Sequence, residues 1–96
     1  MTVAPDPRLL TPDSVPKLWR MTRLHFDPVR QRPVLLYPEG AVLLNDTGAA
    51  ILELCNGSNT VEQIVSILTE RYHADVSTDV HEYLSLMAER ELIRAG

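Results

Sequence analysis

The chain has 96 residues, 45% of them hydrophobic and 23% charged, so it is long enough for one folded domain and too apolar to be disordered throughout. No apolar run approaches the roughly 20 residues of a membrane-spanning helix. The N-terminus lacks the basic start and apolar stretch of a signal peptide, so we expect a cytoplasmic protein. The single cysteine, Cys55, excludes an internal disulfide and any cysteine-based metal cluster.

The net charge of −4 is unevenly distributed along the chain. Residues 1–32 carry six basic and three acidic side chains, whereas residues 33–96 carry three basic and ten acidic ones. The first part therefore has a charge of +3 and the second of −7. Nucleic-acid binding needs clustered Lys and Arg, so we expect no nucleic-acid partner for the acidic part.

Residues 1–16 contain four of the seven prolines. Proline fixes φ and has no backbone N–H, which disfavours regular structure. We therefore predict a flexible, proline-rich arm over 1–16 and a folded domain over 17–96. The alternative is an arm that packs on a partner subunit.

Three short segments are typical of β-strands: 20–27, 33–37 and 41–44. The first alternates between apolar and polar residues, and the other two are short apolar runs. Tight turns containing Pro28 and Pro38-Glu39-Gly40 separate them. Strands joined in this way predict a three-stranded antiparallel meander.

The apolar period then changes to that of helices. Asn45-Asp46-Thr47 offers N-cap side chains for a helix over 48–56, with Gly57 as its stop signal. Thr60 and Gln63 form the pattern of a capping box at the start of a second helix. Ser77 or Thr78 is expected to cap a third helix, after which Leu92 and Ile93 pack back on the domain. The predicted fold is α+β, a β-meander followed by a three-helix bundle, with a winged-helix-like shape.

The residues with nucleophilic or metal-ligating side chains do not form a catalytic or metal-binding pattern. Cys55 lies on an apolar helix face, where a free cysteine usually behaves as a small hydrophobic residue. The three histidines, His25, His73 and His81, lack the spacing of metal ligands. We therefore expect a protein that is not an enzyme and that holds no metal or cofactor.

The segment 41–44 is expected to be an edge strand without a charge or a proline to protect it. Such an edge can accept a peptide as an additional strand. Alternatively, the third helix or a second subunit covers it, in which case strand pairing or exchange yields a homodimer.

A second hypothesis is a winged-helix regulatory or structural protein. DNA-binding winged helices insert a basic helix into the major groove. The corresponding segment here, 78–91, has one basic residue, Arg90, and four acidic residues. Phosphate repulsion opposes this hypothesis.

Several short motifs occur together in the order found in one known family. They are Arg20-x-x-Arg23-Leu24-x-Phe26-Asp27, Val29-Arg30, Leu35-Leu36-Tyr37-Pro38-Glu39-Gly40, Leu44-Asn45, Ala49-x-Ile51-Leu52-x-Leu54, Gly57 and Thr60-Val61-x-x-Ile64. Over about 16–94 the chain resembles the PqqD family of pyrroloquinoline quinone biosynthesis proteins, which are similar to RiPP recognition elements. It departs from the family at Gly48, Cys55 and Glu91, where we expect Ala or Glu, a Leu-Asp-like polarity, and Gly.

The resemblance implies a non-catalytic peptide chaperone. Proteins of this family bind the ribosomal precursor peptide PqqA and present it to the radical S-adenosylmethionine enzyme PqqE. The peptide docks against the third strand and third helix, which here implies Ala41, Val42, Leu43, Leu44, Asn45, Val80, Tyr83, Leu84 and Met87. We expect Tyr83 to be partly exposed, because its hydroxyl needs water or a partner. The basic residues Arg20, Arg23, Arg30 and Arg32 are candidate contacts for the enzyme or the peptide.

Overall fold

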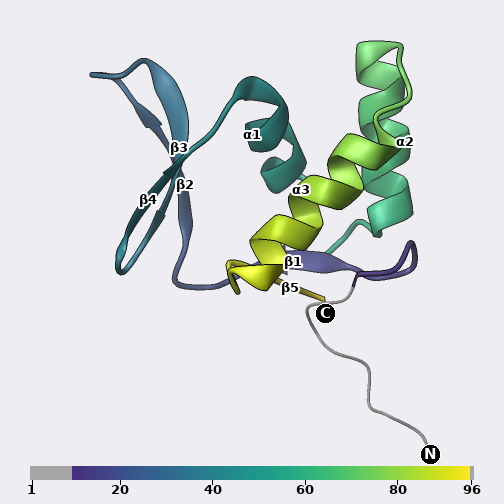
Figure 1. Cartoon of the computed structure of the whole chain (residues 1–96), viewed down its shortest axis with the longest axis horizontal. Helices are drawn as coiled ribbons and strands as arrows, with labels where there is room; N and C mark the ends of the chain where they lie inside the picture. Colours follow the sequence, from purple (N-terminus) through teal and green to yellow (C-terminus); the bar gives the residue numbers. More distant parts are fainter. Residues whose placement is uncertain (1–9, 96) are drawn as a thin grey trace, which may run out of the picture.

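The computed structural model describes residues 10–95, and residues 1–9 and Gly96 lie outside the described part. Its elements, in chain order, are β1 (Pro16–Leu18), β2 (Arg23–Asp27), β3 (Arg32–Tyr37), β4 (Gly40–Leu43), α1 (Asp46–Glu53), α2 (Val61–Tyr72), α3 (Ser77–Glu89) and β5 (Ile93–Ala95). Three strands form a sheet beside three helices (Figure 1). The α+β class predicted from the sequence is confirmed.

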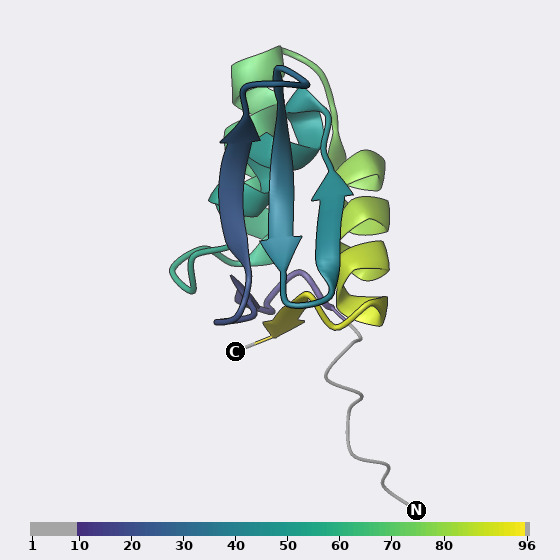
Figure 2. The same ribbon diagram turned by 90° about the vertical axis from the view of Figure 1, so that its left-hand side faces the viewer.

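The main sheet has the order β2-β3-β4 and is antiparallel throughout. Side chains alternate across it, so that Leu24, Leu35 and Val42 face the helices and pack in or against the core. The helices lie behind this face, and the opposite face is bare in the view of Figure 2. The predicted meander is therefore confirmed, with helices on one side only.

The core lies between the sheet and the three helices. Strand β3 and each of the three helices contribute side chains that are at most 1% exposed. They include Leu35 and Leu44 from the sheet side, Ile51 and Leu52 from α1, Ile64 and Leu68 from α2, and Val80, Leu84 and Met87 from α3. Burying a side chain of this size stabilises the fold by about 1.5–3 kcal/mol.

Helix α1 ends earlier than the sequence predicted. Asn45 caps it, its Oδ1 accepting a hydrogen bond of 2.7 Å from the N–H of Gly48, but the helix stops at Glu53 instead of Asn56. The chain leaves the helix because β1 pairs with the segment that follows: Lys17 bridges to Asn56, and the N–H of Leu18 donates to the carbonyl of Cys55. Gly57, with φ of 83°, lies in that loop and does not stop the helix.

The starts of α2 and α3 differ in how they are capped. At α2 the predicted capping box is present: the N–H of Gln63 donates to Oγ1 of Thr60, and the N–H of Thr60 donates to Oε1 of Gln63. At α3 the prediction is wrong, because neither Ser77 nor Thr78 is the N-cap. Val76 occupies that position without a side-chain bond, and the carboxylate of Asp75 accepts the N–H of Ser77 at 2.9 Å.

A two-stranded ribbon that the sequence analysis missed joins the two ends of the described chain. Strand β1 pairs antiparallel with β5, and Pro16 lies opposite Ala95. Residues 10–16, which the sequence analysis assigned to the flexible arm, contact the start of α2. The carbonyls of Pro12 and Ser14 accept the N–H groups of Glu62 and Val61. Residues 1–9 of that arm lie outside the described residues.

Leu92 and Ile93 are both buried, which confirms that the chain packs back on the domain after α3. Between residues 10 and 95, no helix has the length and apolar composition needed to cross a membrane.

Candidate functional site

The free edge of β4 presents backbone groups of two residues. The hairpin register pairs Tyr37 with Gly40, Leu35 with Val42 and Val34 with Leu43, and the N–H of Leu44 donates to the carbonyl of Pro33 at 2.9 Å. Because hydrogen-bonded and non-hydrogen-bonded pairs alternate in antiparallel strands, the N–H and C=O groups of Ala41 and Leu43 point away from β3. The edge therefore offers two donors and two acceptors to another strand.

Arg32 completes the hydrogen bonding at the end of this hairpin. Leu44 faces Pro33, which has no N–H to donate. The guanidinium of Arg32 donates instead to the carbonyl of Leu44, from Nε at 3.3 Å and from Nη2 at 3.1 Å. Arg32, a candidate contact for a partner in the sequence analysis, thus has an internal role in holding the end of the edge strand.

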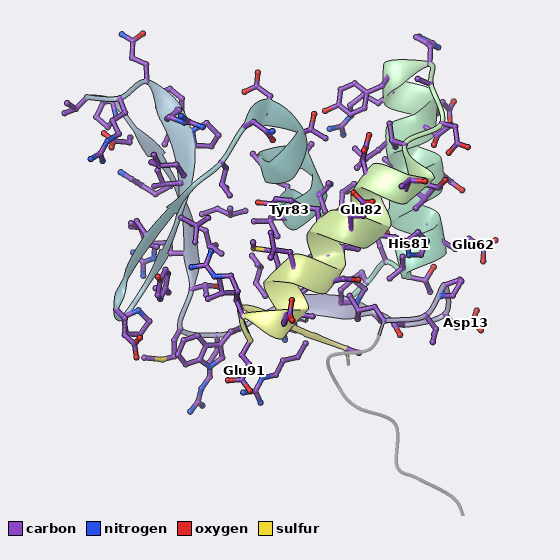
Figure 3. All side chains as sticks on the ribbon, in the orientation of Figure 1. Asp13, Glu62, His81, Glu82, Tyr83 and Glu91 are labelled. Carbon is purple, nitrogen blue, oxygen red and sulfur yellow. The ribbon has the colours of Figure 1, made fainter. Side chains whose placement is uncertain are left out.

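A pocket of about 400 Å³ lies beyond the Asn45 end of β4, between the start of α1 and the first half of α3. Its lining comprises Asn45, Thr47, Gly48, Ile51, Asp79, Glu82, Tyr83 and Leu86. Tyr83 projects from α3 toward α1, as Figure 3 shows. The pocket combines an apolar floor with two carboxylates on its α3 side.

The structure separates the α3 residues of the predicted site into two groups. Val80, Leu84 and Met87 are at most 1% exposed and belong to the core. Tyr83 is half-buried at the pocket, as the sequence analysis expected. Leu86, which the sequence analysis did not select, is 49% exposed and lines the same pocket. The side chains that α3 presents beside β4 are therefore those of Tyr83 and Leu86, on the stripe next to the predicted one.

The five residues predicted on the strand side do lie together on β4 and just after it. Ala41 and Leu43 are exposed, Val42 is half-buried toward the helices, and Leu44 is buried in the core. Asn45 caps α1 and lines the pocket. Of this group, Ala41, Val42, Leu43 and Asn45 are accessible from outside.

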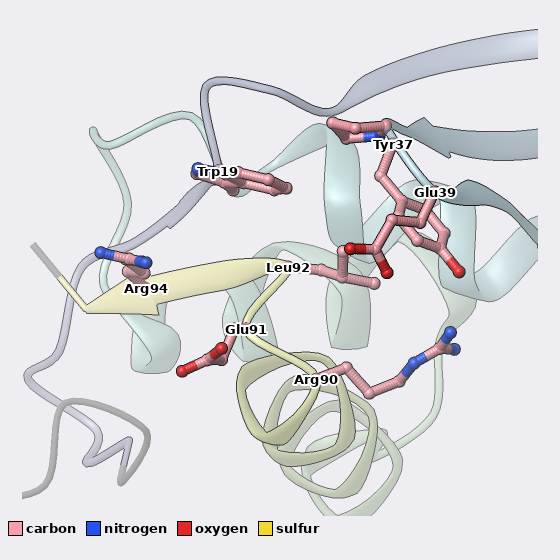
Figure 4. Close-up of a pocket in the computed structure, with 8 residues that line it drawn as sticks. Trp19, Tyr37, Glu39, Arg90, Glu91, Leu92 and Arg94 are labelled. Atoms are coloured by element: carbon pink, nitrogen blue, oxygen red, sulfur yellow. The ribbon is translucent and has the colours of Figure 1, made fainter.

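A second pocket, of about 420 Å³, lies at the opposite end of β4, between the β3–β4 turn and the end of α3. The rings of Trp19 and Tyr37 flank Leu92 in Figure 4, and Glu39 and Arg90 also line the pocket. Because this pocket meets the end of α3 and the first one meets its beginning, α3 runs antiparallel to β4 along the free edge (Figure 2). This pocket was not predicted from the sequence.

The four arginines of the predicted contact cluster have different environments. Arg30 forms an ion pair with Asp27 at 3.1 Å, and Arg32 binds the carbonyl of Leu44. The backbone N–H of Arg30, followed by that of Val29, donates to the Asp27 carboxylate and lowers its pKa. Arg20 and Arg23 are exposed. These two are therefore the members of the cluster best placed to meet a partner.

Among residues 10–95, two titratable side chains have a raised pKa, one in the core and one at the pocket beyond Asn45. Burial raises the pKa of the Cys55 thiol to about 12, so this thiol is neutral at physiological pH. Burial also raises the pKa of Tyr83. Within residues 10–95, no three His, Cys, Asp or Glu side chains gather as they would around a metal ion.

Comparison with known proteins places the chain in a family. The family model "Coenzyme PQQ synthesis protein D (PqqD)" matches residues 33–93. This chain belongs to the PqqD family. The match covers the β3–β4 hairpin, all three helices and the start of β5. It therefore includes the free edge, the whole pocket beyond Asn45 and most of the second pocket, of which Trp19 and Arg94 lie outside the matched range.

Two relatives illustrate how the family occurs. A "PqqA binding protein" of Methylococcus capsulatus is 41% identical over 86 residues, which cover 88% of this chain and 92% of that protein. The "Bifunctional coenzyme PQQ synthesis protein C/D" of Methylorubrum extorquens is 38% identical over 91 residues, 92% of this chain but 24% of the longer protein. The PqqD unit therefore occurs both alone and fused to another synthesis protein.

A solved structure has the same fold. The solution NMR structure of the PqqD truncation of Methylobacterium extorquens PqqCD, described as a functional and stand-alone RiPP recognition element, superposes with a TM-score of 0.74. It is 37% identical, and the match covers 92% of this chain and 97% of that one. These proteins are named for recognition and binding, and this PqqD protein is accordingly not an enzyme.

Proposed function

We propose that this PqqD protein binds the precursor peptide PqqA as an additional strand on the free edge of β4 and presents it to the radical S-adenosylmethionine enzyme PqqE. The observation that carries the proposal is the outward direction of the N–H and C=O groups of Ala41 and Leu43 on an uncharged edge strand. The naming of relatives as PqqA binding proteins supports the choice of peptide.

The main chain of the edge supplies affinity for an extended peptide but little choice among sequences. Successive side chains of an added strand point to opposite faces, so every second peptide side chain would face α3. The pockets at the two ends of β4 lie on that side. In this proposal Tyr83 and Leu86 contact the peptide, whereas Val80, Leu84 and Met87 hold α3 in place from the core.

The folded unit over 17–96 would be the binding domain, with the contacts of residues 10–16 supporting it. Arg20 and Arg23 are exposed, and Arg23 lies on β2, at the edge of the sheet opposite β4, so both would be available to PqqE. The chain brings no cofactor in this proposal, because the chemical step belongs to the enzyme that receives the peptide.

An amide NMR titration with a synthetic PqqA peptide tests the proposal. We expect the largest shifts at Ala41–Asn45 and on the pocket side of α3, around Tyr83 and Leu86. The exposed side of α2, which includes Glu70 and Arg71, serves as an internal control and should not shift. Saturable shifts confined to other elements would contradict the site, and an absence of shifts at high peptide concentration would contradict peptide binding itself.

A further inference from the structure

The bare face of the main sheet has an apolar centre. By alternation with the core-facing Leu35 and Val42, Val34 and Leu36 of β3 and Ala41 and Leu43 of β4 lie on this face. Val34 is buried there beneath its neighbours at 3% exposure, so the exposed apolar side chains are those of Leu36, Ala41 and Leu43. Leu36 is 37% exposed and Leu43 is 47% exposed. No element of residues 10–95 covers this face (Figure 2). A contiguous exposed apolar surface on a small soluble domain marks an interaction site.

The rim of this face is basic. Arg23 lies opposite Leu36, His25 lies opposite Val34, and Arg32 lies opposite Asp27. The one carboxylate among them, that of Asp27, is already engaged by Arg30. Residues 46–90, which form the helices on the other side and their connections, include eight acidic and two basic residues. An acidic protein surface would therefore be attracted to the sheet face and repelled from the helical side.

We propose that the peptide-modifying enzyme docks on this bare sheet face. The enzyme would contact it with a patch of its own that has an apolar centre and an acidic rim. This inference rests on the proposed function. A peptide strand added to β4 would extend the same sheet, and its alternate side chains would emerge on the bare face beside Leu43. The enzyme would thus contact this protein and the outward side chains of the bound peptide on one continuous surface.

A second copy of this chain fits the face less well. A two-fold dimer places the same patch of each copy against the other, so that Arg23 and its basic neighbours would meet their own equivalents. Like charges across an interface oppose association. The charge of the rim therefore favours a different, acidic partner over self-association.

The test measures the binding of PqqE and of a synthetic PqqA peptide to the same set of variants. Leu36→Glu places a carboxylate in the apolar centre, and Arg23→Glu reverses the charge of the rim without touching the edge of β4. Ile67→Glu on α2 is the matched control, because Ile67 is 36% exposed, nearly the same as Leu36, and lies on another element. Circular dichroism and thermal unfolding establish that each variant is folded.

We expect Leu36→Glu and Arg23→Glu each to weaken PqqE binding at least tenfold and to leave PqqA binding within twofold of the unaltered protein. Ile67→Glu should change neither. Normal PqqE binding by folded Arg23→Glu and Leu36→Glu would overturn the inference while leaving the proposed function intact. A dimer that Leu36→Glu dissociates, with PqqE affinity unchanged, would also overturn it and assign the face to self-association. Failure of the unaltered protein to bind PqqA would overturn the proposed function instead.

Discussion

The hydroxyl oxygen of Tyr83 lies 2.9 Å from the position that a Cβ atom would occupy at Gly48. Cζ of the same ring is 3.0 Å from that position, and Oδ1 of Asn45 is 3.1 Å from it. Glycine at position 48 therefore lets the tyrosine of α3 pack directly on the first turn of α1. This contact shapes the pocket at the Asn45 end of β4, and the side chain of the Ala or Glu that the resemblance led us to expect here would meet the tyrosine ring.

Gly48→Ala should destabilise the protein, although alanine is the better helix former. The added methyl group must displace the Tyr83 ring, and overpacking of this kind typically costs about 1–3 kcal/mol. In a Tyr83→Ala background the same substitution should be neutral or stabilising, because the two nearest obstructing atoms, both of the tyrosine ring, are gone. Urea unfolding of the four proteins of this double-mutant cycle measures the coupling. Equal effects of Gly48→Ala in both backgrounds would show that the contact has no energetic role.

Ala41→Pro should weaken PqqA binding by an order of magnitude or more. Proline removes the outward N–H of Ala41 from the free edge without removing a bond between β3 and β4, and edge strands tolerate proline in this orientation. Ala41→Val is the control, because it retains the N–H and suits a strand. Calorimetric titration gives both affinities. Equal affinities for the two folded variants would exclude strand addition at this position.

Leu86→Ala should weaken PqqA binding severalfold with little loss of stability, because Leu86 is half exposed at the pocket. Leu84→Ala, two residues away in the core, should instead cost about 2–5 kcal/mol of unfolding free energy. Ile67→Ala on α2 is the binding control. If Leu86→Ala and Ile67→Ala bind the peptide equally, α3 does not contact the peptide through Leu86.

Glu91→Gly should raise the unfolding free energy by about 1 kcal/mol, because the left-handed backbone conformation is less favourable for a non-glycine residue than for glycine by roughly this amount. Glu91 has φ of 60° and ends α3 in a Schellman motif: its N–H donates to the carbonyl of Ala88, and that of Leu92 to the carbonyl of Met87. Glu89→Gly, inside the helix, should be destabilising. Thermal and urea unfolding compare the two variants, and destabilisation by both would contradict this account of the helix end.

The unfolding free energy should fall as the pH rises above about 9. The Cys55 thiol has a pKa of about 12 in the folded protein against an ordinary value of 9.0, so only the unfolded chain ionises between these values. Each such group contributes at most about 1.4 kcal/mol per pH unit in this window. Tyr83, whose pKa is also raised, contributes with the same sign. Cys55→Ala should have a smaller slope; an unchanged slope in urea unfolding at pH 8 and pH 10.5 would contradict the role of the thiol.

Local sequence signals predicted those parts of the fold that depend on local interactions. The turn at Pro38 and the capping box of Thr60 and Gln63 are encoded within a few residues, and both hairpin and helix formed as expected. The pairing of β1 with β5 joins Pro16 and Ala95, and three-residue strands have too little alternation to be detected. The early end of α1 follows from that same distant pairing, since β1 binds the chain at Asn56.

The candidate site could be predicted on its strand side but not fully on its helix side. An uncharged edge strand is visible in the sequence at 41–44. On α3, the strongest apolar stripe, Val80, Leu84 and Met87, is needed for the core of so small a domain, which leaves the neighbouring stripe with Tyr83 and Leu86 at the surface. Periodicity shows that a helix has an apolar face, but it does not tell which of two adjacent stripes is buried.

The ribbon of β1 and β5 has a consequence for how the chain folds during its synthesis. Translation delivers Pro16–Leu18 well before Ile93–Ala95, yet each strand has the other as its partner. The meander and α1 can form from local contacts while the nascent chain is still growing, whereas the pairing of β1 must wait until β5 has left the ribosome. A nascent chain that has not reached Ile93 would therefore hold β1 without its partner strand.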